Sequence, residues 1–258
     1  MPPPTTTRWE APPGRLQLKE GEAHVWRVYL NQGEAARRAL WDTLAEDERG
    51  RAGRFYFRID REYFVTARGA LRDILGRYLD APPARLRFSY TEYGKPALEG
   101  GAGLGALQFN VSHSHRVALY AVTRSRAVGV DVELVCERNA LPDVAERFFS
   151  AREVAMLRAL PAAARTAAFF NCWTRKEAYI KAIGEGLSHP LHGFTVSLAP
   201  GSPAALLATE ADPAEASRWS LAELSPGPRY AGALAVEGGP PSLRLWQWGD
   251  ARRPRQTE

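Results

Sequence analysis

Four charged residues in the second half of the chain have the types and spacing that phosphate chemistry uses. Asp131 and Glu133 lie two residues apart in the run VGVDVE, and Glu177 lies four residues before Lys181 in WTRKEAYIKAIGEGLS. Residues two apart on a β-strand point to the same face, about 6.6 Å apart along the strand at twice its ~3.3 Å rise. Both carboxylates can therefore lean onto one cation, and Mg²⁺ prefers such oxygen ligands.

Glu177 falls on the apolar side of the helix that its surroundings predict. On a wheel at about 100° per residue it lies in the arc that contains Phe169 and Trp173. A carboxylate among aromatic side chains needs a positive partner, because an unpaired buried charge is costly. Lys181 at i+4 and a metal ion are both candidates. Lys176 falls near the same arc, and we expect its long side chain to extend outward to water.

Each half of this acidic set also has a simpler interpretation. Glu177 and Lys181 can form an i,i+4 ion pair on a solvated face, worth about 0.3–0.5 kcal/mol. Asp131 and Glu133 can be the polar outer face of a half-exposed strand. The three carboxylates together favour the metal hypothesis, because like charges so close repel unless a cation neutralises them.

The segments that must position these residues alternate between strand-like and helical patterns in both halves. Apolar residues recur at helical spacing after Asp60, and Ser150 with Glu153 forms a capping box that predicts a helix start. Strand-like runs are HVWRVYL, RLRFSY, QFNVSHSHRVALYAVT, AVGVDVELV, FTVSL, RWSLAEL, YAGALAV and SLRLWQW. We predict an N-terminal lobe over residues 15–124, a C-terminal lobe over 125–248, and flexible segments at 1–14 and 249–258.

Composition sets broad limits on the class of protein. The chain has 258 residues with 45% hydrophobic and 24% charged residues, which is ordinary for a globular protein. No apolar run approaches the ~20 residues of a membrane span, the N-terminus has no secretory pattern, and two cysteines cannot form a disulfide framework. We therefore expect a cytoplasmic protein. The formal net charge of +5 favours anionic partners without choosing among nucleic acid, phosphorylated cofactors and acidic proteins.

Several motifs in order along the chain carry a specific resemblance. They are RFYF (54–57), YGKP (93–96), FNVSHS (109–114), GVDVE (129–133), FFS followed by Glu153, and WTRKEAYIKAIGEGLS (173–188). Together they resemble the Sfp-type 4′-phosphopantetheinyl transferases over about residues 46–198. The combination of D-x-E with W-x-x-K-E-x-x-x-K is highly specific to that family.

The resemblance implies a fold and a reaction. The fold is α+β, with two similar α/β lobes related by a pseudo-twofold, each a small, mostly antiparallel sheet packed with helices, and a cofactor cleft between them. The reaction is transfer of 4′-phosphopantetheine from coenzyme A to a serine of an acyl or peptidyl carrier protein, with release of 3′,5′-ADP. Such carriers serve fatty acid, polyketide or nonribosomal peptide biosynthesis. By the same resemblance the protein acts as a monomer, without nucleic acid or membrane.

Residue roles follow from the same resemblance, position by position. The metal ligands are Asp131, Glu133 and Glu177, for Mg²⁺ or Mn²⁺, and Lys181 is the catalytic lysine. Glu177 is also our candidate base for the carrier serine, directly or through a water. The coenzyme A contacts are Arg51, Arg68, Lys95, Ser112, His113 and Lys181. Arg51 and Arg68 can instead be surface charges, and Lys95 a turn residue.

Three other functions compete with this hypothesis. A magnesium-dependent phosphodiesterase or nuclease also uses acidic residues and a lysine, but the sequence supplies no second acidic cluster and no histidine that would activate a water beside the first. A nucleic-acid-binding module would leave VGVDVE without a role. A non-catalytic binder of coenzyme A or carrier protein would have no use for the complete acid–lysine set.

Overall fold

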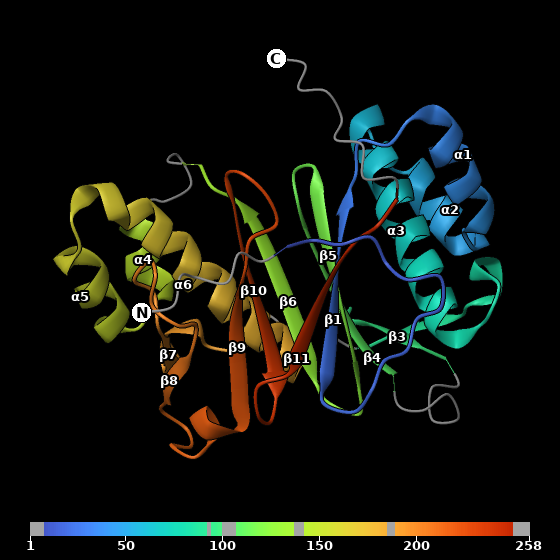
Figure 1. Cartoon of the computed structure of the whole chain (residues 1–258). Helices are drawn as coiled ribbons and strands as arrows, with labels where there is room; N and C mark the ends of the chain where they lie inside the picture. The colour runs from blue at the N-terminus through green and yellow to red at the C-terminus, as the bar shows by residue number, and fades with distance from the viewer. Residues whose placement is uncertain (1–7, 92–93, 100–106, 137–141, 185–188, 250–258) are drawn as a thin grey trace.

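The computed structural model describes residues 8–91, 94–99, 107–136, 142–184 and 189–249, which fold into layers of sheet and helix (Figure 1). The first part of the chain contains β1 (Glu22–Tyr29), α1 (Glu34–Thr43), α2 (Glu46–Gly53), α3 (Arg58–Leu79), β2 (Phe88–Tyr90), β3 (Pro96–Leu98), β4 (Leu107–Ser114) and β5 (Val117–Arg124). The second contains β6 (Val128–Leu134), α4 (Pro142–Phe148), α5 (Ala151–Ala159), α6 (Ala162–Ile183), β7 (Phe194–Val196), β8 (Leu206–Thr209), β9 (Trp219–Leu224), β10 (Tyr230–Glu237) and β11 (Ser242–Gln247). In the described part of the chain, no helix combines the length and apolarity needed to cross a membrane.

The two halves repeat one topology. The main sheets have the strand orders β11-β1-β5-β4 and β6-β10-β9. In each half a strand, a long helix and two further strands follow in sequence, as β1, α3, β4, β5 and as β6, α6, β9, β10. In each half the first strand pairs antiparallel with the last, and the last pairs antiparallel with the one before it. The prediction of an α+β fold with two similar lobes is confirmed.

The C-terminal strand does not stay with the second lobe. We assigned residues up to 248 to that lobe, but β11 pairs in parallel with β1 at the edge of the first sheet. Trp9 and Glu10 belong to the segment that we predict to be flexible; in the structure the Trp9 indole donates to Ser225 O at 2.7 Å and Glu10 N to Leu245 O at 2.9 Å. The pattern of SLRLWQW predicts a strand, but it does not predict the partner strand. Strands pair through backbone hydrogen bonds, which do not depend on side-chain identity. Residues 1–7 and 250–258 lie outside the described residues.

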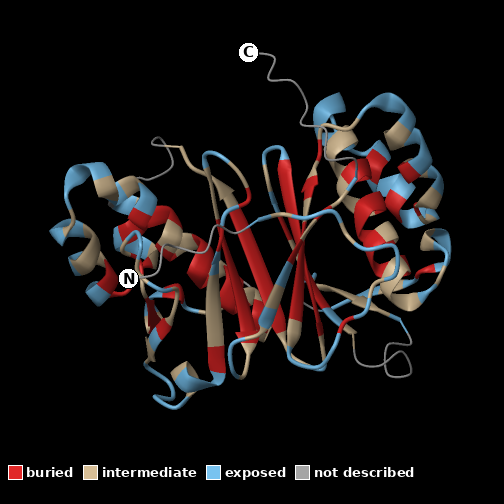
Figure 2. Ribbon diagram, viewed as in Figure 1, coloured by how far each residue is buried: buried red, intermediate tan, exposed pale blue. Residues whose placement is uncertain are grey.

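Apolar side chains fill three successive layers between helices and sheets. The core between the two sheets contains Val25 and Leu119 from the first and Val130 and Leu234 from the second. A second core lies between α3 and the outer face of the first sheet, and a third between α6 and the second sheet. Buried residues accordingly concentrate on the strands and on the inward faces of α3 and α6 (Figure 2).

The helix α6 touches the strand β6 backbone to backbone. A Cβ added at Gly129 would lie 2.0 Å from Ala178 O and 2.5 Å from Ala182 N, far inside van der Waals contact. Val128, Val130 and Val132 point the other way, into the core between the sheets. The predicted alternation of β6 is thus confirmed. Glycine is required because any side chain there would push the helix away from the strand.

Replacing Gly129 by alanine should therefore lower the free energy of unfolding by about 3 kcal/mol or more, at or above the upper end of the range typical of overpacking. The obstructing atoms are helix backbone, which cannot rotate aside as a side chain would. Urea unfolding of G129A, followed by circular dichroism, measures the change. Gly239→Ala is the matched control, because a Cβ there meets nothing within 4 Å. Equal midpoints for G129A and wild type would contradict the close approach.

Candidate active site

Three elements meet around Asp131. Its Oδ1 lies 2.6 Å from Lys181 Nζ of α6 and accepts a 2.8 Å hydrogen bond from Ser112 Oγ of β4. Lys181 Nζ also donates to Ser112 Oγ at 3.0 Å. The carboxylate, the ammonium and the hydroxyl thus form a closed triangle. Residues from both lobes build this site.

The carboxylates of Glu133 and Glu177 belong to the same electrostatic environment. Burial raises the pKa of Glu177 to about 7, with further contributions from Asp131 and Glu133, while Lys181 opposes the rise. Burial, followed by the charge of Asp131, also raises the pKa of Glu133, against hydrogen bonding by Ser114. Repulsion by neighbouring carboxylates adds to burial in these shifts, which indicates that the three acids lie near one another. The structure therefore brings together all four charged residues singled out by the sequence.

The carboxylate of Asp131 offers one free oxygen ligand of the kind that a hard divalent cation prefers. Asp131 Oδ2 is buried and has no hydrogen-bond partner among the described residues, so one carboxylate oxygen is free to bind an ion. Oxygen-only ligands are those that Mg²⁺ and Mn²⁺ accept. No three His, Cys, Asp or Glu side chains in the described ranges stand close enough together to chelate an ion directly. Here the ammonium of Lys181 offsets the charge of Asp131.

Basic groups from the first lobe approach the same place. Lys95 Nζ donates to Lys181 O at 2.8 Å, and burial lowers the pKa of Lys95. Burial against neighbouring protein lowers the pKa of the His113 imidazole, and the positive charges of Lys181 and Arg51 lower it further. His113 nevertheless keeps an exposed surface. Arg51 also stacks its guanidinium over Phe64, with Cζ 5.3 Å from the ring centroid. Lys95 thus contacts Lys181 directly, while His113 lies near both Lys181 and Arg51.

Arg68 has partners of its own. Its guanidinium pairs with Glu48, donates to Tyr90 Oη at 2.8 Å and stacks over Phe88 with Cζ 4.2 Å from the ring centroid. Arg72 holds the other oxygen of Glu48 at 2.7 Å. In this geometry Arg68 joins α3 to α2 and to the β2–β3 hairpin.

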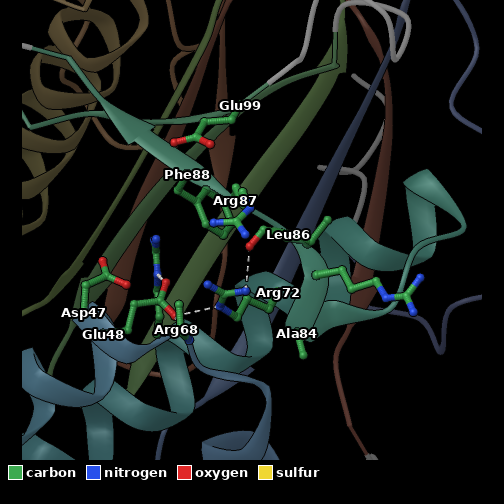
Figure 3. A pocket seen from close by; sticks show the side chains of 11 residues that line it. Asp47, Glu48, Arg68, Arg72, Ala84, Leu86, Arg87, Phe88 and Glu99 are labelled. Atoms are coloured by element: carbon green, nitrogen blue, oxygen red, sulfur yellow. Dashed lines mark hydrogen bonds and ion pairs between the residues drawn. The ribbon is translucent and has the colours of Figure 1, made fainter.

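Arg68 also lines a cavity of about 660 Å³ beside α2 and β2 (Figure 3). Arg68 and Arg72 flank Glu48 on one side, while Phe88 and Glu99 lie across from them. The complete lining is Ala45, Asp47, Glu48, Arg68, Arg72, Ala84, Arg85, Leu86, Arg87, Phe88 and Glu99. Four arginines against three acids leave the cavity with one excess positive charge.

The expectation that Lys176 extends to water is wrong. Its ammonium is fully buried, 2.8 Å from Glu153, and donates to Leu191 O and Phe194 O at 2.7 and 2.6 Å. Glu153 is also the N3 residue of the predicted capping box at Ser150, which is confirmed. One buried carboxylate and two backbone carbonyl oxygens thus satisfy the ammonium of Lys176 inside the protein, so it has no need to reach solvent.

Two polar residues of β4 were missed. Asn110 and Ser114 lie in the FNVSHS motif, and their side chains bond to β6. The signal was an alternation of polar side chains at positions 110, 112 and 114 in a strand next to the largely apolar run of β5. Of the quoted motifs, Tyr93 and residues 185–188 lie outside the described part of the chain.

A two-lobed α+β protein that presents three acids and a lysine at the junction of its lobes has the features of a phosphoryl-transfer enzyme. Models of known families identify it more closely. Residues 127–235 match the 4′-phosphopantetheinyl transferase superfamily, and residues 32–125 match the 4′-phosphopantetheinyl transferase, N-terminal family. The chain belongs to the 4′-phosphopantetheinyl transferase superfamily and is a transferase of the Sfp type.

Named relatives agree with this assignment. The chain is 40% identical to the 4′-phosphopantetheinyl transferase HetI of Nostoc sp. over 240 residues, which cover 93% of this chain and 98% of HetI. It is 33% identical to the 4′-phosphopantetheinyl transferase Sfp of Bacillus subtilis over 176 residues, 67% of this chain and 76% of Sfp. Among solved structures, the holo-[acyl-carrier-protein] synthase of Thermotoga maritima matches with a TM-score of 0.36 and 24% identity, covering 43% of this chain and 62% of the synthase.

The Glu48 ion pairs should make part of the stability depend on pH. Burial of Glu48 disfavours its charged form, but the bonds from Arg72 and the charge of Arg68 outweigh burial and lower its pKa below the ordinary 4.5. A lowered folded-state pKa contributes stability above the ordinary value, and this is lost as the pH falls through the folded-state pKa. We expect Glu48→Gln to reduce the free energy of unfolding at pH 7 by up to about 3–5 kcal/mol.

Urea unfolding of E48Q and wild type from pH 7 down to pH 3 tests this expectation. The difference between them should shrink below about pH 4.5, where the unfolded chain takes up a proton at Glu48 and the contribution of the ion pairs to stability begins to fall. Glu46→Gln, an exposed position on the same helix, controls for the loss of a negative charge. A difference that stays constant across the range would show that the Glu48 carboxylate is not held ionised by its arginines.

Proposed function

We propose that this protein transfers 4′-phosphopantetheine from coenzyme A to a serine hydroxyl of an acyl or peptidyl carrier protein. The serine oxygen forms a bond to the phosphorus that carries pantetheine, the bond from that phosphorus to the rest of the pyrophosphate breaks, and 3′,5′-ADP leaves. Family membership supports the transferred group. The observation that carries the proposal is the placement of Lys181 and Glu177 on one helix against Asp131 of the facing strand.

In this proposal Asp131, Glu133 and Glu177 hold Mg²⁺, or Mn²⁺ with the same ligands. The unpartnered Asp131 oxygen and the mutual repulsion of the three acids support the assignment. A bound divalent cation would supply charge neutralisation at the pyrophosphate. Glu177 would also accept the serine proton, directly or through a water.

Lys181 would stabilise the leaving 3′,5′-ADP. Its ammonium is partly accessible, with the side chain 26% exposed, and lies at the junction of both lobes, so a phosphate can replace Asp131 as its partner. Lys95, Ser112, His113 and Arg51 would bind coenzyme A, since all four approach Lys181 or its immediate partners. Arg68 would bind coenzyme A from the wall of its cavity, through the guanidinium N–H groups that do not bond to Glu48 or Tyr90.

We further expect the enzyme to act in the cytoplasm as a monomer. Its two lobes repeat one topology within a single chain, and both contribute side chains to the site. The acceptor group is a serine hydroxyl of a small carrier protein. The basic groups near Lys181 favour an acidic surface on that carrier protein.

Replacing Glu177 by glutamine or Lys181 by alanine should lower the transfer rate by about 100-fold or more, because each removes a group that acts on the transferring phosphoryl group or its leaving group. The assay incubates the protein with coenzyme A, Mg²⁺ and an apo carrier protein. Mass spectrometry then measures the gain of a phosphopantetheine group on the carrier.

Matched controls are Glu146→Gln on α4 and Lys19→Ala, both exposed charges away from the site. They should retain wild-type rates. Full transfer by E177Q or K181A would refute the assigned roles. A wild-type protein that leaves several apo carriers unmodified, but cleaves nucleic acid, would refute the proposed function in favour of a nuclease.

A further inference from the structure

Three polar side chains of β4 lie on the face of the first sheet that β5 lines with apolar residues. In the β4–β5 pairing Asn110 lies opposite Ala121, and Ser112 lies opposite Leu119. Ser114 lies opposite Val117 in the same register. Ala121, Leu119 and Val117 all belong to the core between the two sheets. Polar residues on a core-facing side are costly unless each finds a partner, so their partners show what they are for.

The partners are backbone amides of β6. Val130 N donates to Asn110 Oδ1 at 3.0 Å, and Leu134 N donates to Ser114 Oγ at 3.1 Å. Between them Val132 N approaches Ser112 Oγ at 3.4 Å. All three pairs are 20 residues apart in sequence, so the two strands run in the same direction in one constant register.

This arrangement replaces a backbone ladder by a side-chain ladder. β4 and β6 are edge strands of different sheets, and the opposite edge of β6 pairs with β10. An unpaired strand edge buried against another sheet leaves amide donors that must be satisfied. The side chains of β4 satisfy them while keeping the two sheets separate, which sets the position of β6 along β4 residue by residue.

Two rungs of this ladder also hold the acidic residues. Ser112 Oγ donates to Asp131 Oδ1 at 2.8 Å, and Ser114 Oγ donates to Glu133 Oε2 at 2.8 Å. A hydroxyl has one proton, so a serine that accepts from the β6 amide directs that proton to the carboxylate. Each serine therefore fixes the backbone of β6 and the orientation of one carboxylate at once.

We propose that Ser114 is a positioning residue, which orients Glu133 for metal binding and sets the register of β6 against β4 together with Asn110. The metal-binding part rests on the proposed function; the register part does not. Ser112 makes the equivalent bonds to Asp131, but it also contacts Lys181 and is assigned to coenzyme A. Ser114 is the rung at which positioning can be tested separately.

Ser114→Ala removes both hydrogen bonds, whereas Ser114→Thr keeps a hydroxyl on a β-branched residue that suits a strand. The matched control is Ser220→Ala in β9, a strand serine whose hydroxyl donates to Gly238 O at 2.7 Å, outside the site. Three readouts apply to each variant. They are the Kd of Mn²⁺ alone, measured by electron paramagnetic resonance, the amide hydrogen exchange of Leu134 and Val130, measured by NMR, and the split between KM for Mg²⁺ and kcat in carrier modification.

For S114A we expect a Kd for Mn²⁺ raised roughly tenfold, as is typical when a hydrogen bond to a metal ligand is lost. The Leu134 amide should exchange about fivefold faster, the equivalent of one ordinary hydrogen bond. Exchange at Val130 should not change, because Asn110 still accepts from it. The KM for Mg²⁺ should rise more than kcat falls. S114T should recover most of each change, and S220A should match wild type.

Other outcomes overturn the proposal. Unchanged Mn²⁺ affinity in a folded S114A refutes the orientation of Glu133, and unchanged exchange at Leu134 refutes the ladder. Equal effects in S114A and S114T would mean that bulk, rather than the hydroxyl, is what matters. If wild-type protein modifies no carrier, the proposed function fails, while Mn²⁺ affinity and amide exchange still decide the role of Ser114.

Discussion

The contact between α6 and the backbone of β6 at Gly129 is the constraint on which the site depends. Because no side chain separates helix from strand there, Glu177 and Lys181 lie within reach of Asp131 two residues further along β6. Ion pairs made by two buried basic side chains of α6 hold the helix against rotation. Lys176 binds Glu153, and the neighbouring arginine at 175 binds Glu223 at 2.9 Å and Ser197 O at 2.7 Å. Removing one partner of a buried pair is strongly destabilising, so the Lys176–Glu153 pair above all restricts the helix to one orientation.

The distribution of charge between the lobes explains why both are needed. The second lobe supplies the three acids and Lys181, and the first supplies hydroxyl and basic groups from β4, from α2 and from the turn before β3. Burial raises the pKa values of Glu133 and Glu177, and repulsion from the other acids adds to the rise. The lysine and the serine hydroxyls offset that repulsion, and basic groups of the first lobe surround the position where phosphates would bind.

The periodicity of apolar residues and the spacing of charged residues predicted most of the site from the sequence. Alternation in VGVDVE placed Asp131 and Glu133 on the face toward α6, and helical spacing placed Glu177 and Lys181 on one wall. Partners distant in sequence could not be predicted in this way. We expected Lys176 to reach water, because a helical wheel shows the direction of a side chain but not its tertiary partner, here Glu153. The same limit applies to β11, whose parallel partner β1 is chosen by backbone groups, and to Arg68, whose partner is Glu48.

The most direct test of this account is where a metal binds in crystals grown with Mn²⁺ and coenzyme A. The anomalous signal of manganese locates the ion independently of the carboxylate positions. We expect one anomalous peak in contact with Asp131, Glu133 and Glu177, with the Lys181 ammonium bound to the phosphates instead of to Asp131. A peak elsewhere, or Lys181 still paired with Asp131 beside fully bound coenzyme A, would contradict it.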